Sequence, residues 1–150
     1  MSGKLVRTAL AAVLVSGGAQ AATIHYADSE TVSTPLALTE DTTISVASGK
    51  TVVYDAAATV SGDFTLTKAG AGELVFLGDN SALGALVISE GYLVASNGLA
   101  LGSSPVTITG QTDGYTGPCG LKLWGVGKDN PDVITYPNAI NVTGNTTATY

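Results

Sequence analysis

Apolar runs of strand-like alternation recur along this chain about every 20 residues, and this period limits the possible folds more than any other feature. The leading runs of successive units are spaced by 20, 22 and 20 residues and begin at Ile44, Phe64, Leu86 and Val106. A second set of runs is spaced by 22 and 19 residues and begins at Val52, Leu74 and Leu93. Such a repeat indicates stacked units, because one short unit buries its apolar face only against the next.

The expected fold is all-β: a right-handed parallel β-helix of about five coils, each of about 20 residues. Each coil contributes one strand per face, and equivalent strands stack about 4.8 Å apart. Gly, Asn, Asp and Ser separate the apolar runs, as sharp bends between strands require. An antiparallel β-sandwich remains the alternative, since it fits the strand spacing nearly as well. The shared period favours the β-helix.

The composition supports a turn-rich β-protein. Charged residues make up only 12% and aromatic residues 6% of the chain, and 19 residues are Gly. A disordered chain is more charged and less apolar, and a helical bundle has more Leu, Glu and Lys. The net charge of -6 disfavours nucleic acid as a partner, because binding to phosphates requires basic patches.

The first 21 residues have the layout of a secretory signal peptide. Lys4 and Arg7 precede the apolar run TALAAVLV, and Ala19-Gln20-Ala21 matches the small-residue cleavage pattern. The run is shorter than the roughly 20 residues that span a bilayer as a helix. We therefore predict cleavage after Ala21. Removal of this segment takes away the only Arg and leaves four Lys against 12 acidic residues, a net charge of -8.

These patterns divide the chain into three segments. Residues 1–21 are the predicted signal peptide, residues 22–43 a predicted N-terminal cap or lead-in, and residues 44–150 the β-helical repeat region. An apolar strand with Ile140 and Val142 comes shortly before Tyr150, and no polar cap follows it. We therefore expect the repeat region to continue beyond the chain end, and uncovered strands at that end to self-associate.

Residues 62–102 carry a more specific pattern than the period alone: L-x-K-x-G-x-G-x-L, L-x-G-x-N, G-x-L-x-V, G-x-L and a closing A-L-G. The residues that match it are Leu66, Lys68, Gly70, Gly72, Leu74, Gly78, Asn80, Gly84, Leu86, Ile88, Gly91, Leu93, Leu101 and Gly102. This stretch resembles the autotransporter-associated β-strand repeat, also called the passenger-associated transport repeat. Ala82 and Leu83 before Gly84 depart mildly from the family pattern. We predict a structural role for the motif residues.

The resemblance implies a β-helical passenger segment of an exported protein of a Gram-negative bacterium, secreted or held at the cell surface in association with the outer membrane. Such a segment aids secretion or forms a stalk or adhesin. The implied partners are neighbouring coils or a C-terminal translocator barrel of a longer protein, and host or polysaccharide surfaces. The leading hypothesis is therefore a non-enzymatic structural segment.

The chain offers few residues for catalysis, and none is predicted to be catalytic or to bind a cofactor or metal. His25 is the only His and lies close to the predicted new N-terminus, where a catalytic base is poorly held. Cys119 is the only Cys, so we expect a half-buried free thiol rather than an internal disulfide. Trp124 is expected in the core or at a coil end, with a sugar-stacking patch including Tyr115 and Tyr136 as the alternative.

A secreted polysaccharide-active β-helix enzyme is the alternative function. Lyases of this architecture use cationic residues, which the mature chain nearly lacks, and glycoside hydrolases need two carboxylates at one cleft. Stacking brings together residues about 20 apart, so the candidate pairs are Asp55 with Asp79 and Asp63 with Glu73. Asp is ordinary in turns, which favours structural roles. Two further features are predicted to be plain turns: a solvated corner framed by Lys68 and Glu73, and the acidic stretch 129–132.

Overall fold

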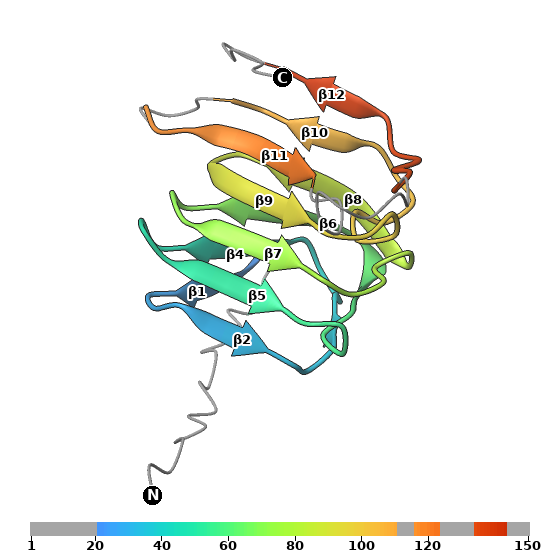
Figure 1. Cartoon of the computed structure of the whole chain (residues 1–150), viewed down its shortest axis with the longest axis horizontal. Helices are drawn as coiled ribbons and strands as arrows, with labels where there is room; N and C mark the ends of the chain where they lie inside the picture. Colours follow the sequence, from blue (N-terminus) through green and yellow to red (C-terminus); the bar gives the residue numbers. More distant parts are fainter. Residues whose placement is uncertain (1–20, 111–115, 124–133, 144–150) are drawn as a thin grey trace, which may run out of the picture.

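A computed structural model describes residues 21–110, 116–123 and 134–143 of the chain, and these residues form two parallel sheets (Figure 1). The seven-stranded sheet contains β1 (Ala22–Tyr26), β4 (Thr42–Val46), β6 (Val60–Ala69), β8 (Leu83–Ile88), β10 (Val106–Ile108) and β12 (Ile140–Val142), in that order, and β3 (Leu36–Ala37) pairs with β6. The five-stranded sheet has the order β11 (Cys119–Leu123), β9 (Gly91–Ala95), β7 (Glu73–Phe76), β5 (Thr51–Tyr54) and β2 (Glu30–Val32).

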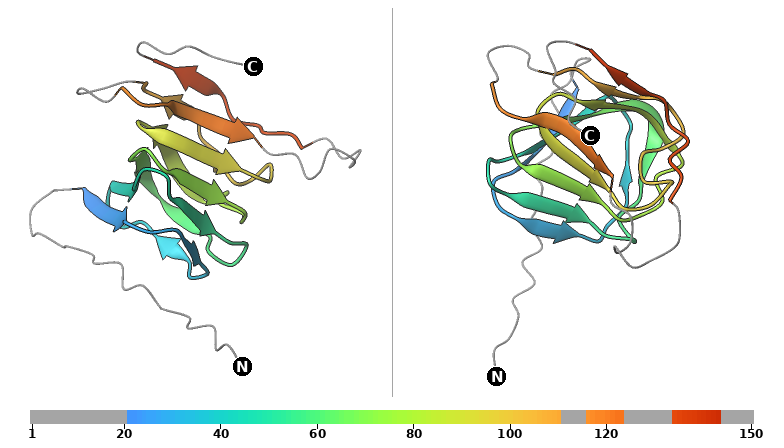
Figure 2. Two further views of the ribbon diagram at one scale, coloured as in Figure 1. Left: turned by 60° about the vertical axis from the view of Figure 1, so that its left-hand side comes forward. Right: turned by 45° about the horizontal axis from the view of Figure 1, so that its top comes forward.

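The chain alternates between the two sheets as it advances, so it forms a β-solenoid of about four turns. Every strand pairing in the described residues is parallel. This confirms the parallel β-helix class and excludes the antiparallel sandwich. Figure 2 shows the strands of both sheets wrapped around one interior, with β1 and β2 at one end of the stack and β12 at the other.

Inward-facing residues form columns that run along the stack. In the five-stranded sheet, the register joins Val52 to Leu74, Leu74 to Leu93 and Leu93 to Leu121. This confirms the second set of runs predicted from the sequence. Alternating residues on these strands are buried, as inward and outward positions of a pleated strand require. Tyr26, Tyr54 and Phe76 add an edge-to-face ladder of aromatic rings to the interior.

The first set of runs has a different register from the one predicted. Leu66, not Phe64, pairs with Leu86, and Leu66 also pairs with Thr42. Phe64 lies two residues earlier and is 39% exposed. The reason is that this coil is longer than its neighbours: the pairing of β6 with β8 shifts between Gly62 and Thr65. The extra residues are accommodated at this bulge.

Residues 22–43, expected as a cap or lead-in, have the construction of the later coils. Ala22 pairs with Thr42 and Tyr26 with Val46, each 20 residues further along the chain. Glu30 pairs with Val52 in the other sheet. The first coil therefore begins at Ala22, directly after the predicted cleavage site. In the described residues there is no helix long and apolar enough to cross a membrane.

Candidate functional site

The apolar motif residues all lie in the core. Their side chains are at most 1% exposed: Leu66, Leu74, Leu86, Ile88, Leu93 and Leu101. They belong to one continuous apolar cluster that runs from Ile24 to Ile108. The prediction that these side chains point into one core is confirmed. The polar motif residues, Lys68 and Asn80, are buried as well.

Lys68 is the largest correction to the sequence analysis, which placed it at a solvated corner. It is fully buried, in the column that holds Ile44 and Ile88. Its Nζ donates to the backbone oxygens of Ala69 and Gly70, each at 2.7 Å, and of Glu90 at 3.0 Å. The corner carbonyls of two coils converge on this point, so the ammonium replaces the solvent that would otherwise hydrate them.

Glu90 belongs to the same corner. Its Oε2 accepts a hydrogen bond from the Gly70 amide at 2.7 Å, so each of the two coils binds the other. Burial lowers the pKa of Lys68 to about 8, and the negative charge of Glu90 acts against that shift. The corner is thus a cation held among carbonyls, with one carboxylate nearby as counter-charge. We name Lys68, its three carbonyl acceptors and Glu90 the lysine corner.

Cys119 lies near the lysine corner. Its thiol is free and half-buried, as predicted, and Sγ lies 3.4 Å from the Ile88 backbone oxygen. Burial raises the pKa of this thiol. A raised pKa means less thiolate at neutral pH, which makes the thiol a poor nucleophile.

Asn80 joins three successive coils. Its Oδ1 accepts from the Val60 amide at 2.7 Å, and its Nδ2 donates to the Ala100 oxygen at 2.8 Å. Both partners are 20 residues away along the chain, one on each side. A single buried amide therefore holds one corner of the stack in register. The motif position Asn80 is explained by this bridge.

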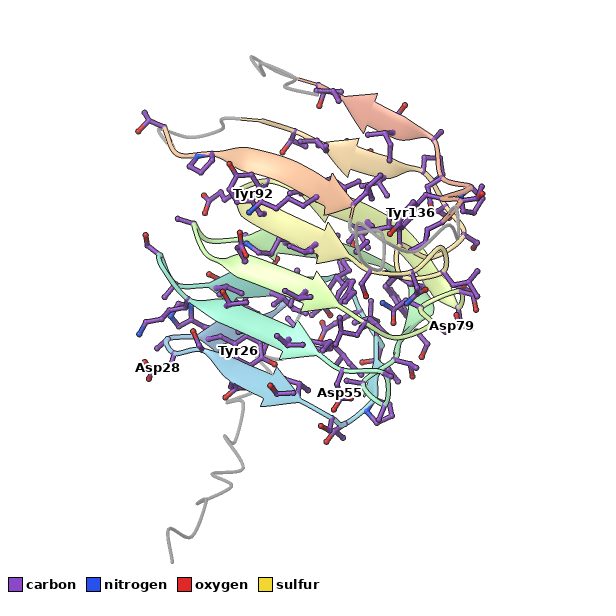
Figure 3. All side chains as sticks on the ribbon, in the orientation of Figure 1. Tyr26, Asp28, Asp55, Asp79, Tyr92 and Tyr136 are labelled. Carbon is purple, nitrogen blue, oxygen red and sulfur yellow. The ribbon has the colours of Figure 1, made fainter. Side chains whose placement is uncertain are left out.

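The candidate acidic residues serve their own turns. Asp55 accepts from Ser33 and from the amides of Ala57 and Ala58, and hydrogen bonds from Ser33 and these amides lower its pKa. Asp79 accepts from the Ser81 amide at 2.8 Å, which lowers its pKa too. Figure 3 shows both on the edge of the stack where β5 and β7 end. Two carboxylates with lowered pKa values lack the protonated member that an acid–base pair requires.

The second candidate pair is also used differently. Glu73 forms an ion pair with Lys122, whose Nζ lies 4.0 Å from the centre of the Tyr92 ring. Asp63 is exposed. In the described residues, no three His, Cys, Asp or Glu side chains gather as a metal site would require.

The remaining candidates lie at the surface or outside the described residues. His25 is exposed on β1, with Nδ1 3.3 Å from Ser45 Oγ. Tyr136 is half-buried against the core, and its hydroxyl donates to the Ala95 oxygen at 2.9 Å. Trp124, Tyr115 and the stretch 129–132 lie outside the described residues.

The two ends of the stack differ. At the C-terminal end, Ile140 and Val142 continue the core-facing columns of Val106 and Ile108 but are 42% and 49% exposed. Leu123, which pairs with buried Ala95, is exposed as well. At the N-terminal end, Ile24 and Tyr26 are buried. The candidate functional region of this chain is thus a coil stack with an uncovered apolar C-terminal end.

Sequence reasoning did not identify Glu90, although one signal was available. Glu90 lies 20 residues after Gly70, one period of the repeat, so a period-aligned search places it opposite the Gly70 amide. Comparisons of the chain with protein-family models, curated proteins and solved structures found no match.

Proposed function

We propose that this chain is an exported structural segment: a passenger-like β-solenoid of a Gram-negative cell surface, without a catalytic role. The observation that carries the proposal is the use made of the motif residues. Lys68, Asn80 and Glu90 all bind a neighbouring coil, so the most specific part of the sequence serves the stacking of coils.

The proposal also accounts for the polar contents of the core. A chain that folds after crossing a membrane benefits from carrying its own stabilising groups. Lys68 supplies a cation to the corner carbonyls from within the chain. With Cys119 as the only Cys, the fold requires no internal disulfide.

The uncovered C-terminal end fits stepwise folding. Each coil of a solenoid contacts only its neighbours, so folding can proceed as coils are added one after another. In this chain each added coil buries the apolar columns of the preceding one and pairs with its free strands. Ile140 and Val142 are the positions on which a following coil would stack.

Export is tested by expressing the full chain in a Gram-negative host and separating cytoplasm from exported fractions. The expected product outside the inner membrane begins at Ala22. An Ala19→Arg, Ala21→Arg variant is the control, because large charged side chains do not fit the cleavage pattern. An intact chain beginning at Met1 and confined to the cytoplasm would overturn the proposal.

The structural role is tested by adding one coil. Val106 pairs with Leu86, so a second copy of residues 87–106 inserted after Val106 adds one turn in register. We expect the longer chain to fold and to need more urea for unfolding, since another interface between coils is gained. An insertion of residues 87–101 in the same place is the control, because it breaks the register. Equal destabilisation by both insertions would contradict a modular coil stack.

A further inference from the structure

The backbone of β12 is self-complementary. The Val106 amide donates to the Ala139 oxygen, and the Thr143 amide donates to the Ile108 oxygen. Backbone groups of a strand alternate between its two sides, so those of Ile140 and Val142 face the free side. A second β12 placed antiparallel, with Asn141 opposite Asn141, sets each Ile140 opposite a Val142. That arrangement makes about four hydrogen bonds between the strands.

The side chains of β12 agree with this arrangement. Directly opposite residues of an antiparallel pair lie on the same face, so Ile140 and Val142 of both copies would meet on the interior side. Both are apolar and about half exposed in one chain. Asn138 adds a polar requirement: its Nδ2 donates to Gly102 and Ser104 oxygens, but its buried Oδ1 has no partner in the described residues. An atom like this is stabilised when a neighbouring chain supplies a donor.

The opposite end of the stack is unsuited to the same role. Glu30 on β2 occupies the inward column that continues through Val52, Leu74, Leu93 and Leu121. Stacking the N-terminal end of one copy on the C-terminal end of another would place the Glu30 carboxylate against Leu121. An inward charge on an edge strand prevents such pairing, because burying it without a partner costs several kcal/mol.

We propose that two copies of this chain pair tail to tail through β12, and that Glu30 prevents the head-to-tail stacking that would produce open-ended fibres. A two-fold contact uses the same patch on both copies and closes after two, whereas head-to-tail stacking does not close. Asp28 and the hydroxyls of Tyr26 and Tyr54 are the other titratable groups near Glu30, and none of them supplies a cation to neutralise it. The proposal uses the same uncovered end as the proposed function but is independent of export.

The assembly is tested by sedimentation velocity on the purified chain over a wide range of concentrations. We expect a monomer–dimer equilibrium with no larger species. Val142→Lys should leave a folded monomer, while Thr107→Lys, which places the same charge on the outward face of β10, should still dimerise. A wild-type chain that stays monomeric at all concentrations would overturn the dimer and leave the export experiment unaffected.

The geometry is tested by cross-linking. The two-fold axis places residues 141 of both copies opposite each other, at a separation that suits a disulfide. In a Cys119→Ser background, Asn141→Cys should give a covalent dimer under mild oxidation. Thr23→Cys, on the outward face of β1, should not. Equal cross-linking of both variants would contradict the tail-to-tail arrangement.

The role of Glu30 is tested by Glu30→Leu and Glu30→Gln, with Thr31→Leu as the outward-facing control and circular dichroism as the check on folding. Both Glu30 variants should form larger linear assemblies, and the control should remain a dimer. Adding Val142→Lys should abolish the larger species. If both Glu30 variants fold and remain dimers, Glu30 is not the block; if the wild-type chain itself forms fibres, the block does not exist.

Discussion

Lys68 and Glu90 bind each other's coils in both directions: the Lys68 ammonium donates to the Glu90 backbone oxygen at 3.0 Å, and the Glu90 carboxylate accepts from the Gly70 amide at 2.7 Å. The backbone of one coil thereby receives a side chain from the next. This reciprocity links the charge of Lys68 to the stacking of two coils.

Removing the charge should therefore destabilise the fold strongly. Lys68→Met keeps the length of the side chain but leaves three buried carbonyls without their donor and Glu90 without a counter-charge. We expect the free energy of unfolding to fall by about 3 kcal/mol. Lys50→Met is the control: it breaks the surface ion pair with Asp28 and should cost less than about 1 kcal/mol. Urea unfolding followed by circular dichroism measures both, and equal losses would mean that Lys68 is not buried.

The lowered pKa of Lys68 predicts a rise of stability at alkaline pH. Its pKa is about 8 in the folded chain and about 10.4 when unfolded, so the unfolded chain binds more protons between these values. The contribution of Lys68 should increase stability as pH rises through this window, with a slope of at most about 1.4 kcal/mol per pH unit. The measurement is the difference between urea titrations of wild type and Lys68→Met from pH 7 to 9.5, about the range below Tyr ionisation. A flat difference would contradict the assigned pKa.

The period and one column of the core could be predicted from the sequence, because Val52, Leu74 and Leu93 keep a nearly constant spacing and no bulge interrupts their strands. The position of Phe64 could not. Alternation repeats every two residues, so a two-residue displacement keeps the apolar pattern and changes only the partner. The bulge at Gly62 that causes this displacement depends on contacts between coils.

The lysine corner was beyond sequence reasoning for another reason. Lys is almost never fully buried, so an exposed corner was the natural expectation for Lys68. Its acceptors are backbone oxygens, which carry no side-chain signature, and they converge only when the coil of Glu90 stacks on that of Gly70. The difference in chemistry between Glu30 and Ile140 likewise gains its meaning only from the register of the stack.

The register of β6 can be tested by truncation. Leu66→Ala should lower the free energy of unfolding by about 3 kcal/mol, because it leaves a cavity in the core. Phe64→Ala should cost less than about 1 kcal/mol, since this ring is already partly in solvent. Urea unfolding compares them, and a larger loss for Phe64→Ala would restore the register that the sequence suggested.

Asn80 offers an isosteric test of the corner bridge. Asn80→Asp keeps the acceptor for the Val60 amide but turns the donor toward Ala100 into a second acceptor. We expect a loss of about 3 kcal/mol at neutral pH and partial recovery in acid, where the introduced carboxyl regains a proton to donate. The reverse change at the neighbouring exposed turn, Asp79→Asn, should be nearly neutral. Thermal unfolding at two pH values measures both, and an Asn80→Asp variant as stable as wild type would show that the bridge is dispensable.

Gly91 and Gly49 separate close coil stacking from backbone strain. Both have left-handed backbones, with φ of 66° and 71°, so Ala at either position carries a conformational cost of about 1 kcal/mol. They differ in their surroundings: a Cβ at Gly91 would press on the oxygens of Gly70 and Gly72, one of which binds Lys68, whereas a Cβ at Gly49 would meet open space. Gly91→Ala should therefore lose about 3 kcal/mol or more, and Gly49→Ala only the conformational cost. Urea unfolding of the two variants gives the difference. If the two losses were equal, the close approach of the Gly91 coil to the Gly70 corner would not contribute to stability, and the lysine corner would not depend on how tightly these coils stack.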